Sequence, residues 1–532
     1  MLLSEPMTAP GTVVDVVVVG TGAGAAALVG RLVARGVSVC MIERGVDEAP
    51  ASAPSEHQAG RGFAPPSALT NTLLGPDGRP TEPFALEGSA LGGGTVVYTG
   101  NVLRFQPGDF HRHRTLGDIR GAQLADWPLT YDELAPYYEE MEDEMGVAGD
   151  AAANPFEAPR RGPYPAPAIA LDRSGHLCAA AARQLGWHPF PMPSVASPAR
   201  GRAACVRCGL CTAFLCTVDA RWSARPQLLA AAAAGKLSLV LGATVTRVLV
   251  TDDCATGVEY AAKDGSLHAI SARTVVLAAN AIQTPRLLLQ SATSRHPDGL
   301  ANGSGQVGRN LMTHVMERFM TIGHVDGEPT VSAAGCTLGI QDFYDPQRSG
   351  APLPITFEPR TMGAYAPFAR FVTGDPSWAA CDEPTLRDRF SRNVVVLTMM
   401  EDLPRAENRV RLHATLRDAL GLPVPVVDHA PHELDVATSL VGAAKARELL
   451  AVVGARDVVS VSPRTARFHI MGTCRMGDDP QRSVVDRDGR THEIDNLWIA
   501  DASVFVSSAG VNPSLTVQAL ARRTADRMLA RS

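Results

Sequence analysis

The chain has 532 residues, of which 45% are hydrophobic and 20% charged, and its net charge is −6. This length supports two or more domains with sizeable cores, and the small negative charge provides no basic surface for nucleic acid. No run of about 18 uncharged apolar residues is present, so we expect no membrane-spanning helix. The first 20 residues lack a basic region before an apolar core, so we expect no signal peptide and a cytoplasmic protein.

The first predicted elements are a strand, a glycine turn and a helix. Residues 13–19 (VVDVVVV) are typical of a strand buried on both faces. Gly20, Gly22 and Gly24 follow, and Ala25 stands where the third small residue of GxGxxG/A belongs. Gly20 permits a tight turn, Gly22 allows a pyrophosphate to approach the backbone, and Ala25 lets the helix lie close to the sheet. The free N–H groups of the helix then face the phosphates.

A second strand, VSVCMIE, ends in Glu43, 23 residues after Gly20. A carboxylate at this position accepts hydrogen bonds from an adenosine ribose, and it disfavours the phosphorylated ribose of NADP. The whole unit therefore predicts a dinucleotide site, but it does not separate FAD from NAD.

A second glycine loop follows at Gly92, Gly93 and Gly94, with Thr95 next. Because glycine has no Cβ, such a loop can press its backbone against a flat ligand.

Four cysteines cluster in CVRCGLCTAFLC: Cys205, Cys208, Cys211 and Cys216. The spacing is close to the ferredoxin run C-x2-C-x2-C-x3-C-P, but its last interval is one residue longer and the proline is absent. No histidine lies nearby to complete a zinc site. We therefore expect a thiol-rich structural loop without a metal, and an iron–sulfur centre remains the alternative.

The carboxyl-terminal region places polar residues in apolar surroundings. His469 stands within RFHIMGTCRMG (467–477), where it could be a structural residue, a metal ligand or a catalytic base. Asp501 and Ala502 follow the predicted strand NLWIA, where Asp501 could be the N-cap of a helix or a ligand contact. Asn512 precedes a proline, a pair that also begins ordinary turns.

Several segments in this order resemble the glucose–methanol–choline (GMC) family of FAD oxidoreductases. They are the two glycine loops, VTRVLVTDDCATGVEY (245–260), ARTVVLAANAIQTPRLLLQS (272–291), VGRNLMTHV (307–315), HIMGTCRMG and the segment from Asn496 onward. The similarity is greatest to the bacterial sugar and polyol dehydrogenase branch, some of whose members hold an iron–sulfur cluster in the cysteine region. Asn280-Ala281 departs from the usual Gly-Ala.

The resemblance implies an α/β (α+β overall) protein, with a Rossmann-type FAD-binding domain and a substrate domain built on a largely antiparallel sheet. It divides the chain into residues 1–310 for the main FAD-binding part with some substrate-domain insertions, 311–464 for the substrate domain, and 465–532 for a carboxyl-terminal FAD-binding segment that carries the catalytic histidine and asparagine. It also implies that Val245, Asp501 and Ala502 contact the FAD. The Gly92–Thr95 loop lacks the histidine that binds flavin covalently in some members, so we expect non-covalent FAD.

The resemblance further implies that His469 is the catalytic base beside flavin N5 and that Asn512 is its partner. The amide would hold the substrate oxygen while the imidazole takes the hydroxyl proton. His314 would be structural, and His111 and His113 would be solvated.

The expected activity is FAD-dependent oxidation of an alcohol group on a sugar, aminosugar or cyclitol. Within the family the chain is similar to enzymes of aminoglycoside biosynthesis that oxidise the 6'-hydroxyl of paromamine-like intermediates. Oxygen, a quinone or another carrier would accept the electrons. A sterol or fatty-alcohol oxidase, and a flavin-containing lyase using the same histidine, are the alternatives.

Overall fold

The structure is a computed structural model. It describes residues 2–3, 13–47, 72–74, 80–85, 87–209, 211, 216, 218–314, 318–330, 335–462 and 467–531.

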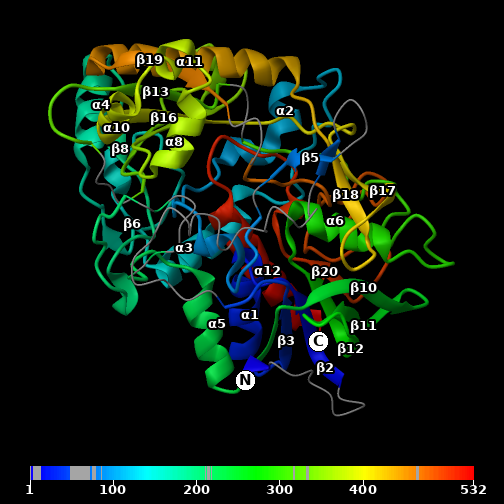
Figure 1. The fold of residues 1–532 in the computed structure, drawn as a ribbon. Helices are drawn as coiled ribbons and strands as arrows, with labels where there is room; N and C mark the ends of the chain where they lie inside the picture. Colours follow the sequence, from blue (N-terminus) through cyan, green and yellow to red (C-terminus); the bar gives the residue numbers. More distant parts are fainter. Residues whose placement is uncertain are drawn as a thin grey trace.

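A parallel sheet forms the base of the molecule (Figure 1). Strand β2 (Val13–Val19) lies between β3 (Val39–Glu43) and β12 (Leu267–Leu277), and all three are parallel. On one side β9 (Leu237–Leu241) pairs with β3, and on the other β20 (Leu497–Ile499) pairs with β12. The predicted strands 13–19 and up to Glu43 are confirmed, and the carboxyl-terminal strand joins the same sheet.

The long strand β12 also extends the sheet with an antiparallel part. Its first half pairs with β11 (Cys254–Ala261), which pairs with β10 (Thr244–Thr251). At the opposite edge β1 (Leu2–Leu3) pairs with β9.

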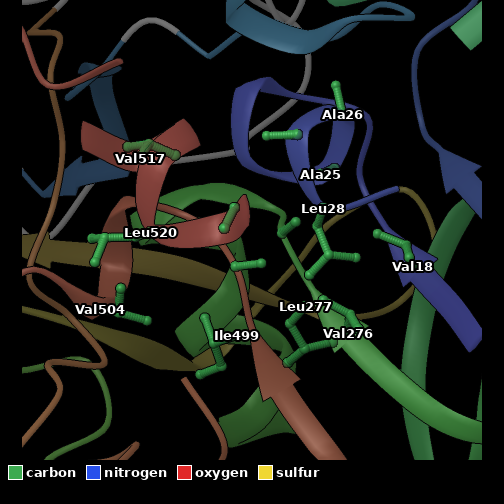
Figure 2. Packing of buried hydrophobic residues seen from close by; sticks show 14 of the residues in the cluster. Val18, Ala25, Ala26, Leu28, Val276, Leu277, Ile499, Val504, Val517 and Leu520 are labelled. Carbon is green, nitrogen blue, oxygen red and sulfur yellow. The ribbon is translucent and has the colours of Figure 1, made fainter. Parts of the chain in front are cut away.

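Two helices from opposite ends of the chain pack together on this sheet: α1 (Ala23–Ala34) and α12 (Ser514–Arg531). Figure 2 shows the buried side chains that meet between helices and strands: Val18, Ala25, Leu28, Val276, Leu277, Ile499, Val517 and Leu520. The approach is closest at Gly24, where a Cβ would lie 1.9 Å from the carbonyl oxygen of Ala500. Only a glycine allows the backbones to come this close.

A second, antiparallel sheet forms the other main unit, which confirms the predicted substrate-domain architecture. Its strand order is β19 (Arg456–Val461), β13 (Met320–His324), β16 (Asn393–Met400), β15 (Ile355–Arg360), β14 (Leu338–Ile340) and β8 (Pro189–Pro191). Every pairing in it is antiparallel. Helices α11 (Glu433–Val453) and α4 (Arg173–Gln184) cover one face of this sheet (Figure 1).

The opposite face is covered by α8 (Tyr365–Val372), α9 (Pro376–Ala379) and α10 (Glu383–Ser391), which bury Phe368 and Trp378 against it. A third, smaller sheet combines β17 (Arg409–Arg417) and β18 (Pro423–Asp428) with β4 (Thr72–Leu74) and β5 (Pro80–Pro83). The sequence did not predict this sheet.

The remaining elements are short or connect these units: η2 (Gly93–Val96), η3 (Pro107–His111), α2 (Arg112–Leu116), α3 (Tyr131–Met145), β6 (Ala148–Gly149), η4 (Ala151–Ala153), β7 (Ala166–Pro167), η5 (Ala199–Gly201), α5 (Ala224–Ala233), α6 (Asn280–Gln290), α7 (Pro346–Ser349) and η6 (Ala502–Val504).

The predicted segments 311–464 and 465–532 correspond to most of the second sheet and to β20 with α12, respectively. Strand β8 comes from outside 311–464, as an insertion from the first segment. The exact boundaries stay predictions.

The contact at Gly24 can be tested with a matched pair of substitutions in α1. Gly24→Ala should lower the free energy of unfolding by about 1–3 kcal/mol, because the new methyl group overlaps the Ala500 carbonyl. Gly30→Ala is the control, since its Cβ would meet only the end of Arg522 at 3.7 Å. It should raise stability by about 0.5–1 kcal/mol through helix propensity. Denaturant unfolding measures both, and equal effects would contradict the close approach.

Candidate active site

The first glycine turn has the predicted geometry. Gly20 follows β2 with a φ of +97°, and a Cβ there would lie 2.5 Å from the Ala278 carbonyl oxygen. Ala25 is fully buried between helix and sheet. By contrast, no atom lies within 4 Å of a Cβ built on Gly22, so its backbone faces an open space in front of helix α1.

Glu43 ends β3 and is buried. Its carboxylate accepts hydrogen bonds from Thr21 Oγ1 at 2.7 Å, from Thr21 N at 3.2 Å and from Gly45 N at 2.8 Å. Burial raises the pKa of this carboxyl, and those hydrogen bonds partly oppose the shift. The residue therefore fixes the glycine turn, and its contact with a ribose stays a prediction.

The second glycine loop packs directly on the first. Gly92 and Gly93 have φ values of +97° and +54°, and a Cβ on Gly93 would lie 2.8 Å from Gly22 Cα. Thr95 anchors the loop, since its Oγ1 donates to Gly92 O and accepts from Ala224 N. A Cβ on Gly94, as on Gly22, would meet nothing within 4 Å. Two adjacent loops thus present bare backbone to open space, which fits a dinucleotide.

Buried side-chain atoms without hydrogen-bond partners occur in several parts of the described chain. Among the described residues, both amide atoms of Asn101, Asn512 Oδ1 and Ser514 Oγ have no hydrogen-bond partner. Leaving such groups unpaired is costly.

Neighbouring residues of the protein donate hydrogen bonds to the carboxylate of Asp501. Its carboxylate accepts from Thr284 Oγ1 at 2.6 Å, from Ser503 N at 2.8 Å and from Asn280 N at 3.0 Å. The N-cap interpretation is therefore confirmed, and a ligand contact stays a prediction. Burial raises the pKa of this carboxyl. Asn280, which replaces the usual glycine, has a φ of +78°.

The two other residues expected near the FAD lie in the backbone framework of this region. Val245 pairs with Tyr260 beside an irregularity in β10, and the carbonyl of Ala502 accepts a hydrogen bond from Gly472 N at 3.0 Å. Their FAD contacts stay predictions.

His469 faces a second histidine. Its Nδ1 lies 3.0 Å from Nδ1 of His314, and the rings meet edge to face. Burial lowers the pKa of His314 to about 4. Burial, with smaller effects of His314 and Arg360, lowers the pKa of His469 well below 6.5. Both rings are therefore neutral near pH 7, as a base requires.

The contact between His469 and His314 was not predicted from the sequence, which paired His469 with Asn512 and indicated a structural role for His314. The two histidines are 155 residues apart. An antiparallel bridge between Met312 and Met471 brings their segments together. No local pattern signals such a pairing.

A buried polar chain holds these two segments in place. Asp402 Oδ2 accepts from Thr313 N at 2.7 Å and lies 2.9 Å from His429 Nε2. Arg467 Nη1 lies 2.9 Å from His429 Nδ1. Because a guanidinium only donates, His429 accepts at Nδ1 and donates from Nε2 to Asp402. This series of hydrogen bonds thus connects Thr313, next to His314, with Arg467, which is two residues before His469.

Asn512 belongs to a loop that contacts the histidine pair. His314 Nε2 lies 3.0 Å from Ser508 O and 3.1 Å from Ala509 O in that loop. The structure therefore brings His469, His314 and the backbone of Ser508 and Ala509 together, and the catalytic role of Asn512, three residues further on, stays a prediction. His113 is exposed as predicted, whereas His111 is only partly so.

Comparison with known proteins decides the family. The family description "GMC oxidoreductase" matches residues 14–316 with its amino-terminal part and residues 404–521 with its carboxyl-terminal part. The chain belongs to the GMC oxidoreductase family. It is accordingly an FAD-dependent oxidoreductase acting on alcohols.

Three relatives in the GMC family match nearly the whole chain. The 6'''-hydroxyparomomycin C oxidase of Streptomyces lividus is 35% identical, covering 98% of this chain and 92% of that protein. The paromamine 6'-oxidase of Streptomyces fradiae is 32% identical (96% and 90% covered). The 2-methyl-1,2-propanediol dehydrogenase of Mycolicibacterium austroafricanum is 31% identical (98% and 96% covered).

A solved structure shares the GMC fold. The pyridoxine 4-oxidase from Mesorbium loti superposes with a TM-score of 0.66 at 19% identity, covering 97% of this chain and 99% of that one. Within the described residues, no helix is long and apolar enough to cross a membrane.

Of the four clustered cysteines, Cys211 is linked to the second glycine loop through Arg221. Arg221 donates to Cys211 O and, at 2.7 Å, to Val96 O, which ends that loop. Cys208 is exposed, and Cys205, Cys211 and Cys216 are partly buried. Burial raises the pKa of Cys211 to about 11. In the part of the chain that the structure describes, no three His, Cys, Asp or Glu side chains are grouped as metal ligands.

The absence of a metal at these cysteines stays a prediction. Protein purified without oxygen should contain no stoichiometric iron or acid-labile sulfide, because the cysteine spacing departs from the ferredoxin pattern. Elemental analysis and EPR measure this directly. Iron and sulfide that are retained by the unaltered protein but lost in Cys208→Ser would contradict it.

Proposed function

We propose that this GMC oxidoreductase oxidises a hydroxyl group of a small polyhydroxylated substrate, and that the substrate is an aminoglycoside intermediate of the paromamine type. The neutral His469–His314 pair beside the Asn512 loop carries the chemical part of this proposal. The two relatives named for paromamine-type substrates support the choice of substrate.

His469 takes the hydroxyl proton in this proposal. Its Nδ1 faces His314, so Nε2 is the atom left to receive a proton from the substrate. FAD, when bound, supplies the hydride acceptor. Asn512 then holds the substrate oxygen as negative charge develops on it. The donor in this role is the amide Nδ2, and the amide oxygen, which has no hydrogen-bond partner among the described residues, is available to accept from a ligand.

We propose that the cofactor lies along the two glycine loops. Gly22 and Gly94 leave room for it, and Gly20, Gly24 and Gly92 shape the turns around it. Oxygen, a quinone or another carrier accepts the electrons, since the relatives include both named oxidases and a named dehydrogenase. We also propose a cytoplasmic location, supported by ten cysteines that are all unpaired.

The proposal is tested by an anaerobic spectral screen of the purified protein. Paromamine-type aminoglycosides, simple sugars, cyclitols and 2-methyl-1,2-propanediol are each added, and bleaching of the flavin absorbance is followed. We expect rapid bleaching with the aminoglycosides. Bleaching by the diol alone would contradict the substrate class, and product formation without bleaching would indicate a lyase. Peroxide formed in air distinguishes oxygen from other acceptors.

His469→Ala should retain FAD but reduce the rate of flavin reduction by about 10²–10⁴-fold, because a positioned base is lost. Stopped-flow absorbance measures this rate. His268→Ala is the control, since this histidine lies near the start of β12 and its side chain contacts Ser266 and Tyr260, not the histidine pair. A near-normal rate of flavin reduction in His469→Ala would indicate that His469 has only a structural role.

A further inference from the structure

We propose that His314 is a positioning residue that fixes the tautomer of His469, so that Nε2 of His469 carries the lone pair that accepts the substrate proton. This inference rests on the proposed function and assigns to His314 a role beyond packing.

The argument begins at the far side of His314. Its Nε2 lies 3.0 Å from the carbonyl oxygen of Ser508 and 3.1 Å from that of Ala509. Carbonyl oxygens only accept hydrogen bonds, so this nitrogen must carry the proton. A neutral imidazole has a single N–H, and Nδ1 of His314 therefore holds a lone pair.

The same reasoning continues across the histidine pair. Nδ1 of His314 and Nδ1 of His469 are 3.0 Å apart. Because the first carries a lone pair, the contact is a hydrogen bond only if the second carries the proton. A neutral His469 protonated at Nδ1 is unprotonated at Nε2. The two backbone carbonyls thus determine, through His314, which nitrogen of His469 is basic.

The surroundings of the two rings agree with this assignment. His314 is completely buried, whereas His469 is only partly buried. The low pKa of His314, caused by its burial, keeps its ring neutral. Among the described residues, no hydrogen bond reaches Nε2 of His469, so that nitrogen is available to a ligand. The backbone of His469 has a φ of +58°, an uncommon conformation for a residue with a side chain.

A purely structural His314 would act differently. In that case its important bond would be the one to the Ser508 and Ala509 carbonyls, which holds the Asn512 loop. Two amide substitutions separate these possibilities. In His314→Asn, the amide can place an acceptor where Nδ1 stood, which preserves the bond to His469. In His314→Gln, it can place a donor where Nε2 stood, which preserves the bond to the carbonyls.

The experiment compares both variants with the unaltered holoenzyme and with His268→Ala. We expect His314→Gln to slow flavin reduction by at least about 10-fold, as loss of a tautomer-fixing partner does elsewhere. His314→Asn should keep more of the rate. FAD content and thermal unfolding are measured in parallel, so that a folding defect is recognised. A Gln variant faster than the Asn variant would overturn the proposal.

A second measurement requires no substrate. In holoenzyme labelled with ¹⁵N-histidine, two-bond ¹⁵N–¹H correlations report which ring nitrogen is protonated, and His469→Ala identifies the signals of that ring. We expect His469 to be protonated at Nδ1 and His314 at Nε2. A proton on Nε2 of His469 would overturn the proposal. If no alcohol reduces the flavin, the proposed function fails, while the NMR result still decides the tautomer.

Discussion

The contact of Gly24 with the carbonyl of Ala500 is the constraint on which the site depends. It places helix α1 against Ala500, which follows β20, so the glycine fingerprint near the amino end meets the carboxyl-terminal segment of the chain. From there, backbone bonds extend the arrangement. Ala502 O accepts from Gly472 N at 3.0 Å, and Ser503 O accepts from Cys474 N at 2.7 Å. His469 is therefore positioned relative to the nucleotide loop by main-chain geometry.

Burial then determines the charge state of the site. Removing imidazoles from water disfavours their charged form, which leaves His314 and His469 neutral. Burial has the opposite effect on the pKa of a carboxyl group, and it raises the pKa of the nearby Asp402 to about 8. Hydrogen bonds from Thr313 and His429 compensate for part of that burial. The main effect of these buried hydrogen bonds is to hold the segments of His314 and His469 in place, because buried charged groups often add little net stability.

Much of the first sheet could be predicted from the sequence, because its signals are local. A β-branched run, a glycine turn and a terminal Glu43 lie within about 30 residues and have the predicted structure. The motif around His469 predicted a catalytic role for this residue but did not indicate its contact with His314. His314, the addition of β8 to the second sheet, and the pairing of β4 with β18 depend on contacts between distant segments. No spacing within one segment encodes them.

In the proposed function, His469 is a neutral base at physiological pH. The most direct test is the rate of flavin reduction at saturating substrate from about pH 5 to about pH 9. A lowered pKa keeps the ring unprotonated as the pH falls, so the rate should stay constant through 6.5, the ordinary value for histidine, and decline only well below it. A rate that falls with an apparent pKa at or above 6.5 would contradict the account.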